Sequence, residues 1–346
     1  MKKYLFVSIL TLMSSISIFA QSSLIATLSH EGEMRAFYGG SALASAHAAA
    51  VDGDIITLSG GNFSATTITK AITLRGAGML ADAAQEIIPT VIQGTVQFNI
   101  TDTTRRLVVE GMKFANDVTV AQKLVMPLIQ KCLFSGFNSA SAVVKQGVFS
   151  NCYITNSYTF GSGSNVTFIN SYVSEFGQKS ENTNCNSFFD FQNCVIRSYG
   201  HDSMFSTSTG LSYIKNSTLT NCVIVGSNEM VGSLPNSTFC YNCVATGTAT
   251  KAFNNVAGAN NIVVNDVSAV MKEFTGTNYN DGISFALTDE AASTYLGSDG
   301  TQVGMYGGLL PFTPMPYTLQ ITKCNVASKS TVDGKLSVEI EVSGIE

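Results

Sequence analysis

The chain of 346 residues lacks tryptophan, contains only 6 prolines and 3 histidines, and has only 12% Asp, Glu, Lys and Arg. That charged share is about half of what an ordinary soluble domain carries. The 24 acidic residues also outnumber the 19 basic ones, so positive charge is scarce. Nucleic acid and anionic membrane surfaces are therefore disfavoured as partners.

Long apolar runs are missing as well, except at the start of the chain. Lys2 and Lys3 precede an apolar stretch, residues 4–20, that is too short and too rich in serine for a stable membrane span. This pattern predicts a signal peptide over residues 1–20, cut after Ala20, with an uncleaved anchor as the alternative. We therefore expect a secreted protein, extracellular, periplasmic or on the cell surface, with no membrane span after cleavage.

What the chain does contain is a repeat of about 20 residues, the period of a solenoid. The last residue of a short recurring pattern falls at Met112, Cys132, Cys152, Ser171, Cys194, Cys222 and Cys243. Two positions further on, each unit places another residue, apolar in every case: Phe114, Phe134, Ile154, Val173, Ile196, Ile224 and Ala245. Side chains alternate along a strand, so columns that stay apolar from coil to coil must point into the core.

A column of asparagines stands one position before the cysteines, at Asn151, Asn170, Asn193, Asn221 and Asn242. Asparagine tolerates the left-handed backbone conformation that a sharp corner requires. Its amide can also bond the equivalent amide in the coil above or below. The sequence therefore predicts a structural ladder of asparagines at one corner of the solenoid.

The eight cysteines of an exported chain would normally suggest a disulfide framework. Here six of them fall in inward columns, so we expect free, buried thiols that act as small apolar fillers. The spacing of Cys240 and Cys243 would also suit redox chemistry or zinc, but the repeat accounts for it. We therefore expect no metal and no cofactor. Cys185 and Cys324 lie outside the columns.

Two further segments resemble the pectin-lyase-like family of parallel β-helices. The helical run 41–50 leads into Asp52-Gly-Asp54 and then into Thr73-Leu-Arg-Gly-Ala-Gly78, as at the start of that family's solenoids. Residues 295–308 resemble the way in which many secreted bacterial members finish. With the repeat, the resemblance covers roughly residues 35–310. It implies an all-β fold, a right-handed parallel β-helix with an N-terminal capping helix.

The predicted domain organisation has three parts. After the signal peptide, residues 21–310 form the β-helix with its N-terminal cap, and residues 311–346 form a linker and a C-terminal β-hairpin tail. Three prolines, at 311, 314 and 316, stiffen the linker, and Asp333-Gly334 supplies the turn of the hairpin. We expect this hairpin to pack on the solenoid or to cap its far end.

The outward row between the two inward columns is unusually apolar, running from Lys113 and Leu133 through Tyr153 and Tyr172 to valines. One interpretation is that loops or the tail shield this row. The other is a binding face on which Tyr153 and Tyr172 stack against sugar rings.

Catalysis in the pectin-lyase-like family uses a Lys or Arg base with acidic calcium ligands, or clustered carboxylates, and this chain shows neither pattern. Its two longest coils bring together loops that carry several polar residues: Glu175, Asp190, Arg197, His201 and Asp202. A base and a charge clamp are conceivable from Arg197, His201 and Asp202, with Glu175 and Asp190 as binding residues beside the two tyrosines.

Two hypotheses remain. The favoured one is a secreted or cell-surface β-helix module that binds a polysaccharide or a cell-surface protein without catalysis. The alternative is a polysaccharide lyase or glycoside hydrolase that acts through the loop cluster around residues 175–202. The favoured hypothesis leads because a fold confers no activity by itself and the family's catalytic charges are absent.

Overall fold

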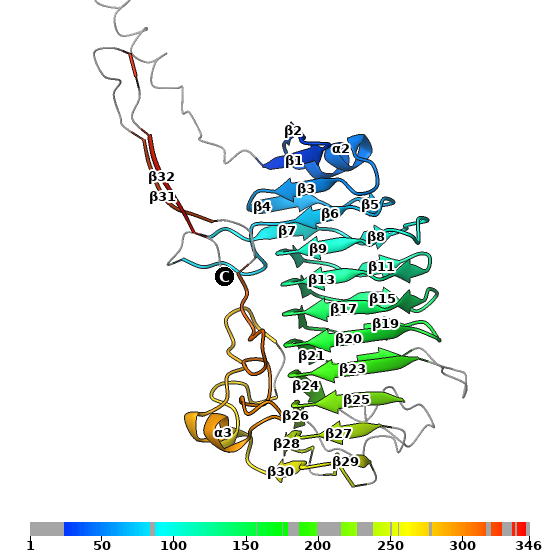
Figure 1. Ribbon diagram of the computed structural model, residues 1–346, viewed down its shortest axis with the longest axis vertical. Helices are drawn as coiled ribbons and strands as arrows, with labels where there is room; N and C mark the ends of the chain where they lie inside the picture. The colour runs from blue at the N-terminus through cyan, green and yellow to red at the C-terminus, as the bar shows by residue number, and fades with distance from the viewer. Residues whose placement is uncertain are drawn as a thin grey trace, which may run out of the picture.

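The computed structural model is nearly all β and stacks its strands into a parallel β-helix, which confirms the predicted fold (Figure 1). It describes residues 24–83, 87–156, 158–174, 176–178, 187–198, 216–226, 238–249, 251–254, 256–276, 279–315, 320–326, 334–335 and 338–343. In the described part of the chain no helix is long and apolar enough to cross a membrane.

Three sheets form the walls of the solenoid, and we call them A, B and C. Sheet A has 12 strands: β2 (Glu33–Tyr38), β1 (Ile25–His30), β3 (Ile55–Leu58), β6 (Thr73–Arg75), β9 (Val108–Glu110), β13 (Leu128–Gln130), β17 (Gly147–Ser150), β20 (Asn165–Ile169), β23 (Phe188–Gln192), β25 (Ser217–Thr220), β27 (Phe239–Tyr241) and β29 (Ala257–Ala259). Sheet B has 10 strands: β4 (Gly61–Ser64), β7 (Thr90–Gln93), β10 (Lys113–Phe114), β14 (Leu133–Phe134), β18 (Tyr153–Ile154), β21 (Tyr172–Ser174), β24 (Val195–Ser198), β26 (Val223–Gly226), β28 (Val244–Gly247) and β30 (Ile262–Val264).

Sheet C and two small pairs complete the strands. Sheet C has 6 strands: β5 (Thr67–Ile68), β8 (Val96–Phe98), β11 (Val118–Val120), β15 (Phe137–Ser139), β19 (Tyr158–Phe160) and β22 (Phe176–Gln178). The remaining pairs are β12 (Leu124–Val125) with β16 (Val144–Lys145), and β31 (Gln320–Val326) with β32 (Val338–Ser343). The latter pair is antiparallel, as expected for a C-terminal hairpin.

The columns of residues that the repeat predicted to point inward lie in the core, and neighbouring coils pair in the expected register. On sheet B, Phe114 lies beside Phe134, and Phe134 beside Ile154, and the column continues in step to Ala245. On sheet A, rings stack along the column, with centroids of Phe168 and Phe191 5.0 Å apart. Six cysteines fill inward positions as free, fully buried thiols: Cys132, Cys152, Cys194, Cys222, Cys240 and Cys243. Burial raises the pKa of the Cys152 thiol to about 12, which keeps it protonated.

The corner between sheets A and B carries the predicted left-handed residue in every repeat. The φ angle is 69° at Gly111, 50° at Lys131, and between 45° and 59° at Asn151, Asn170, Asn193, Asn221, Asn242 and Asn260. Glycine and asparagine bear this conformation at least cost among the common residues, which explains their recurrence at this position.

The first coil is closed by helix α2 (Ala42–Ala49), which packs on β1 and β2 (Figure 1). The helix turns Leu43 and Ala46 into the core. His47 accepts a hydrogen bond on Nε2 from the Thr69 amide at 3.1 Å, and burial lowers the pKa of its imidazole. Strands β1 and β2 pair antiparallel, so the parallel stack ends at this point. This cap agrees with the predicted N-terminal helix.

The coils end at Val264, earlier than the predicted boundary at residue 310. Residues 265–276 and 279–315, which we call the return segment, turn back and run along the outside of sheet B (Figure 1). The segment contains the short helices η1 (Val267–Ala269) and α3 (Asp289–Thr294). Its last described residue, Met315, accepts a hydrogen bond from Lys131 Nζ, in the second repeat. The hairpin β31–β32 lies on the side of the first coils (Figure 1), so of the two expected places, packing on the solenoid or capping its far end, the second is not found.

Candidate functional site

The apolar outward row of sheet B is covered over most of its length, as the shielding interpretation expected. Phe285 of the return segment stacks on Tyr172 with ring centroids 4.1 Å apart, and Phe312 stacks on Tyr153 at 4.8 Å. Tyr153 and Tyr172 are only 4% and 0% exposed. The interpretation of these tyrosines as a sugar-stacking face is wrong, because the protein's own aromatic rings occupy the positions that sugars would need.

The asparagine column holds the return segment in place. Asn170 Nδ2 donates to the carbonyls of Met305 and Gly307, at 2.8 and 2.7 Å. Asn151 Oδ1 accepts from the Thr313 amide at 2.8 Å, and Asn221 Oδ1 accepts from Ser298 at 3.1 Å.

The predicted bond between asparagines of neighbouring coils is found, in the described part of the chain, between Asn260 and Asn242 at 3.0 Å. At Asn151, Asn170 and Asn221 the corner faces the return segment, so these amides bond its backbone groups rather than each other. The ladder prediction is thus corrected: the column docks the return segment.

The predicted catalytic cluster is not assembled by the described residues. Arg197 on β24 is 2% exposed and donates to Gly276 O at 2.7 Å and to Ser174 Oγ at 3.3 Å. A guanidinium held under the return segment in this way cannot act on an external substrate. His201 and Asp202, its proposed partners, lie outside the described residues, and so does Glu175.

Asp190 lies apart from Arg197, on the outer face of sheet A. Its Oδ2 accepts a hydrogen bond from Gln192 Nε2 at 2.6 Å. The same face exposes three aromatic rings, Phe188, Phe239 and Tyr241, at 55%, 45% and 39%. Phe239 follows Asp190 along one outward row, through Thr218. This aromatic stretch is a second exposed surface, separate from sheet B.

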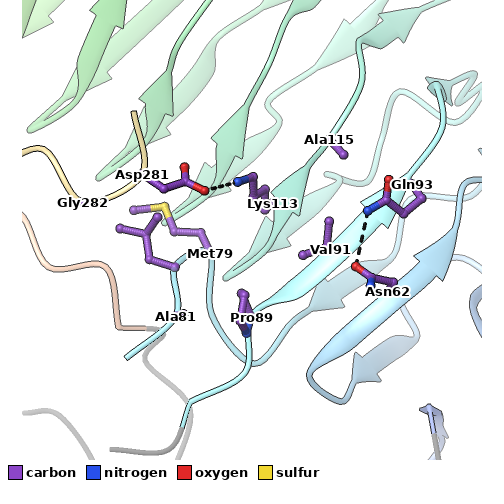
Figure 2. A pocket seen from close by; sticks show the side chains of 11 residues that line it. Asn62, Met79, Ala81, Pro89, Val91, Gln93, Lys113, Ala115, Asp281 and Gly282 are labelled. Carbon is purple, nitrogen blue, oxygen red and sulfur yellow. Dashed lines mark hydrogen bonds and ion pairs between the residues drawn. The ribbon is translucent and has the colours of Figure 1, made fainter. Parts of the chain in front are cut away.

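A pocket of about 560 Å³ opens on sheet B where the return segment stops covering it (Figure 2). Its floor is the outer face of β4, β7 and β10 in the first coils. One wall is the loop between β6 and β7, and the other is the return segment at Asp281 and Gly282. It is lined by Asn62, Met79, Leu80, Ala81, Pro89, Val91, Gln93, Lys113, Ala115, Asp281 and Gly282.

The polar groups of the pocket stand on opposite sides of an apolar floor (Figure 2). Gln93 Nε2 donates to Asn62 Oδ1 at 3.3 Å, and both side chains are exposed. Lys113 forms an ion pair with Asp281 at the rim, with side chains 25% and 57% exposed. Val91, in the same outward row as Asn62 and Lys113, lies between them.

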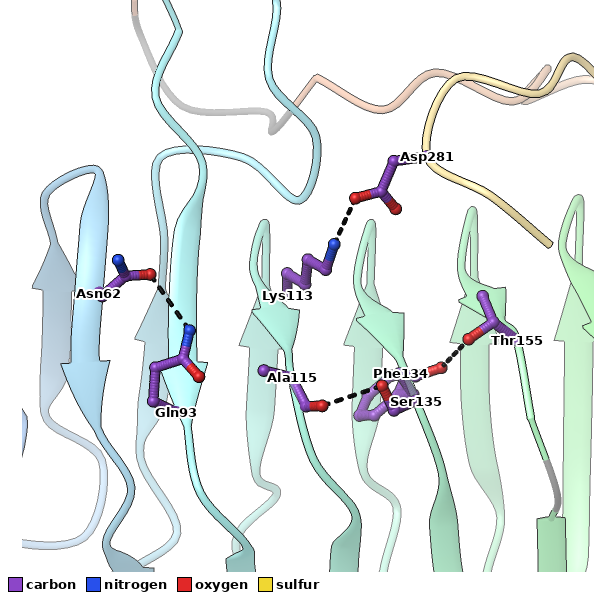
Figure 3. A network of polar contacts seen from close by, with 8 residues as sticks. All are labelled: Asn62, Gln93, Lys113, Ala115, Phe134, Ser135, Thr155 and Asp281. Atoms are coloured by element: carbon purple, nitrogen blue, oxygen red, sulfur yellow. Dashed lines mark hydrogen bonds and ion pairs between the residues drawn. The ribbon is translucent and has the colours of Figure 1, made fainter.

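A row that includes the polar side chains of Gln93, Ser135 and Thr155 continues from the pocket along sheet B (Figure 3). It runs from Gln93 through Ala115 to Ser135 and Thr155, one residue in each coil. Ser135 Oγ donates to the Ala115 carbonyl and Thr155 Oγ1 to the Phe134 carbonyl, both at 3.1 Å. Both hydroxyls are half-buried and keep lone pairs free to accept hydrogen bonds. Figure 3 shows pocket and row on one continuous face.

The chemistry available in the pocket is recognition by hydrogen bonds. Its two titratable side chains, Lys113 and Asp281, form an ion pair with each other. The described residues also contain no group of three or more His, Cys, Asp or Glu side chains placed to hold a metal ion.

The sequence did not predict this pocket, although the outward row described from the sequence includes one of its residues. Lys113 is the charged residue that precedes the apolar part of this outward row, and it lies where the return segment no longer covers the row. Asp281, 168 residues further along the chain, gives no sequence clue to its position beside Lys113.

Comparisons with known proteins add no relative: no family model matches the chain, and no match was found among curated proteins or solved structures.

Proposed function

We propose that the protein is a non-catalytic β-helix module that binds a polysaccharide in the sheet B pocket and along the polar row beside it. The observation that carries this proposal is the composition of the pocket. Two exposed amides, Asn62 and Gln93, face a paired Lys113 and Asp281 across the apolar side chain of Val91. Its volume of about 560 Å³ is within the usual range for small-ligand sites.

The chemistry of these side chains suits a sugar. An amide both donates and accepts hydrogen bonds, as vicinal hydroxyl groups require, and carboxylate and ammonium groups bond hydroxyls more strongly. The apolar faces of Val91, Pro89 and Met79 offer contact to the C–H face of a pyranose ring. Because neighbouring coils are about 4.8 Å apart, Ser135 and Thr155 offer hydroxyls at intervals close to the length of one sugar unit.

Two expectations from the sequence support the same class of ligand. The N-terminal segment has the pattern of a signal peptide, which would place the protein where polysaccharides occur. The likeness of its coils to the pectin-lyase-like family also favours a glycan as the ligand. We therefore propose a secreted or cell-surface protein with a glycan partner.

The proposal excludes catalysis for a physical reason. Polysaccharide lyases and hydrolases need a free base or a pair of carboxyl groups with separated pKa values. In the pocket, Lys113 and Asp281 neutralise each other, and Arg197 is buried beneath Gly276. A lyase or hydrolase is therefore not the preferred function.

The test is a glycan array and a panel of soluble polysaccharides, with reducing-end release and absorbance at 235 nm recorded beside binding. We expect binding without product, weakened at least tenfold by Asn62→Ala with Gln93→Ala. The matched control is Phe239→Ala with Tyr241→Ala, which changes the exposed aromatic face of sheet A and should leave binding unchanged. Loss of binding in the control alone would show that the binding site lies on sheet A. Product formation that is lost in Lys113→Met would show that the protein is an enzyme.

A further inference from the structure

Within the described part of the chain, two strand edges at the far end of the solenoid are unpaired. β29 and β30 are the last strands of sheets A and B, and each has a strand neighbour on one side only within the described residues. All three residues of β29 are exposed. Ile262 and Val263 on β30 are each 42% exposed, although Val263 continues the inward column of Ala245, which is fully buried. The inward side chain of Val263 is therefore exposed at this end, while Cys240 and Ala245 in the coil before it are fully buried.

The two ends of the solenoid are protected very differently. At the first coil, α2 covers the core, and the outermost strand, β2, carries the charged residues Glu33 and Arg35 (Figure 1). Charges on an edge strand discourage pairing with another chain. Residues 256–264, in contrast, contain no charged residue and no proline. The sequence thus lacks the usual protection at the end where the structure leaves strands unpaired.

The arrangement of the two edges restricts what can cover them. β29 leads into the corner at Asn260 and Asn261, and β30 leads out of it, so the two edges meet at a fixed angle. A single extended peptide could pair with one edge only. A second coil end with the same corner can pair its strands with both edges at once. The N-terminal end of a second copy is closed by α2, which leaves the C-terminal end of that copy.

We propose that two copies of this chain associate through their C-terminal coils, related by a two-fold axis through the corner at Asn260 and Asn261. A two-fold axis at this place brings β29 of one copy against β30 of the other, in antiparallel orientation, twice. Residues equally far from the corner then face each other. Ala259 faces Ile262 of the second copy, Gly258 faces Val263, and Ala257 faces Val264.

This register keeps the side-chain directions consistent. Gly258 and Val263 both belong to inward columns, since they pair with Cys240 and Ala245 in the preceding coil. Gly258 has no side chain, and a Cβ there would lie 1.7 Å from the Cys240 carbonyl oxygen. Val263 of the second copy therefore supplies the apolar side chain that this position of the column lacks, and the two cores become continuous.

The first experiment is sedimentation equilibrium on the full-length protein from low micromolar to near-millimolar concentration. We expect the mass to rise from that of the monomer, at most 36.7 kDa, towards twice that value. Val263→Lys should raise the dissociation constant at least tenfold, because it places a charge at the centre of the joined cores. Met34→Lys, at a side chain 72% exposed on β2, makes the same change at the opposite end and should have no effect.

The second experiment tests the register. A variant with Ala259→Cys and Ile262→Cys should form a disulfide-linked dimer under mild oxidation, whereas the unaltered chain treated in the same way should not. A monomer at every concentration would overturn the proposal. So would a dimer that persists in Val263→Lys, one that is lost when residues 316–346 are removed, or one that the paired cysteines fail to link.

Discussion

At the scale of single residues, the corner position between sheets A and B has two structural roles. Each residue of the column takes a positive φ, from Gly111 to Asn260, so that the chain can turn sharply from sheet A into sheet B. Where the return segment passes, the side chain at this corner also holds it. Asn170 shows both roles, with φ at 45° and two amide hydrogen bonds to backbone carbonyls.

Substitutions at Asn170 should separate the two roles. Asn170→Gly keeps the left-handed backbone but loses both hydrogen bonds, and we expect a loss of about 1–3 kcal/mol in the free energy of unfolding. Asn170→Ala loses the same bonds and, unlike glycine or asparagine, tolerates the left-handed conformation poorly, which adds about 1–2 kcal/mol. Urea unfolding measures both. As a control, Asn260→Gly removes an exposed bond and should change stability little; equal effects of glycine and alanine at 170 would contradict the backbone role.

Lys131 stands at the same corner position and gives the column a pH dependence. Burial lowers the pKa of its ammonium group from 10.5 to about 8, while Nζ donates to the Met315 carbonyl. Between these two values the unfolded chain binds more protons than the folded one, so stability from this group rises with pH across that interval. Below it, the folded protein bears the full penalty of a buried charge.

The measurement compares the unaltered protein with Lys131→Met by urea unfolding at several pH values from neutral to about pH 10. We expect the unaltered protein to gain stability relative to the variant above about pH 8, where the folded lysine loses its proton. Tyrosines and other groups titrate in both proteins and cancel in the difference. Parallel curves throughout would show that Lys131 keeps an ordinary pKa.

At the scale of elements, the return segment acts as the outer wall of sheet B. It packs Phe274, Phe285 and Phe312 against Tyr153, Tyr172 and the valines of the outward row. These side chains form an apolar cluster of their own, outside the solenoid and separated from its core by the sheet. The cover that the segment gives sheet B stops at Asp281, and this residue forms one wall of the pocket.

Phe285→Ala should loosen this wall. The Phe285 ring is 1% exposed and lies 4.1 Å from Tyr172 and 4.9 Å from Phe274 between centroids. Its removal should cost about 3–5 kcal/mol in the free energy of unfolding. Limited proteolysis should then cut residues 265–315 faster. Leu309→Ala, at a side chain 95% exposed on the same segment, is the matched control; equal proteolysis rates in the two variants would mean that the rings do not hold the segment.

The elements also show where sequence reasoning succeeded and where it ended. The inward columns, the corner asparagines and the capping helix could be predicted because each depends on neighbours in the next coil or in the same turn. The outward row could only be described as apolar and in need of cover. Its cover comes from residues far along the chain, as the contact from Asn170 to Met305, 135 residues apart, illustrates.

At the scale of the whole molecule, the protein is a solenoid whose first coil is covered by α2 and whose last coil is exposed. The return segment starts at the last coil and covers the outer face of sheet B back towards the first coils. The end covered by α2 bears charges on its edge strand, and the exposed end bears none. The pocket lies near the end covered by α2, beyond the reach of the return segment's cover. If two copies join at their exposed ends, the two pockets lie far apart and near opposite ends of the assembly, which would favour binding two sites on one long polysaccharide.

The sequence by itself determined the repeat, the direction of each core column, the left-handed corner and the free state of the buried thiols. A period of about 20 residues places chemically similar side chains one above another, so each coil specifies its neighbour. Only the tertiary structure decided that the chain turns back at Val264, that Tyr153, Tyr172 and Arg197 are buried, and that Lys113 meets Asp281. Those contacts join segments with no shared pattern, and packing of aromatic surfaces, which has no fixed spacing in sequence, sets where they meet.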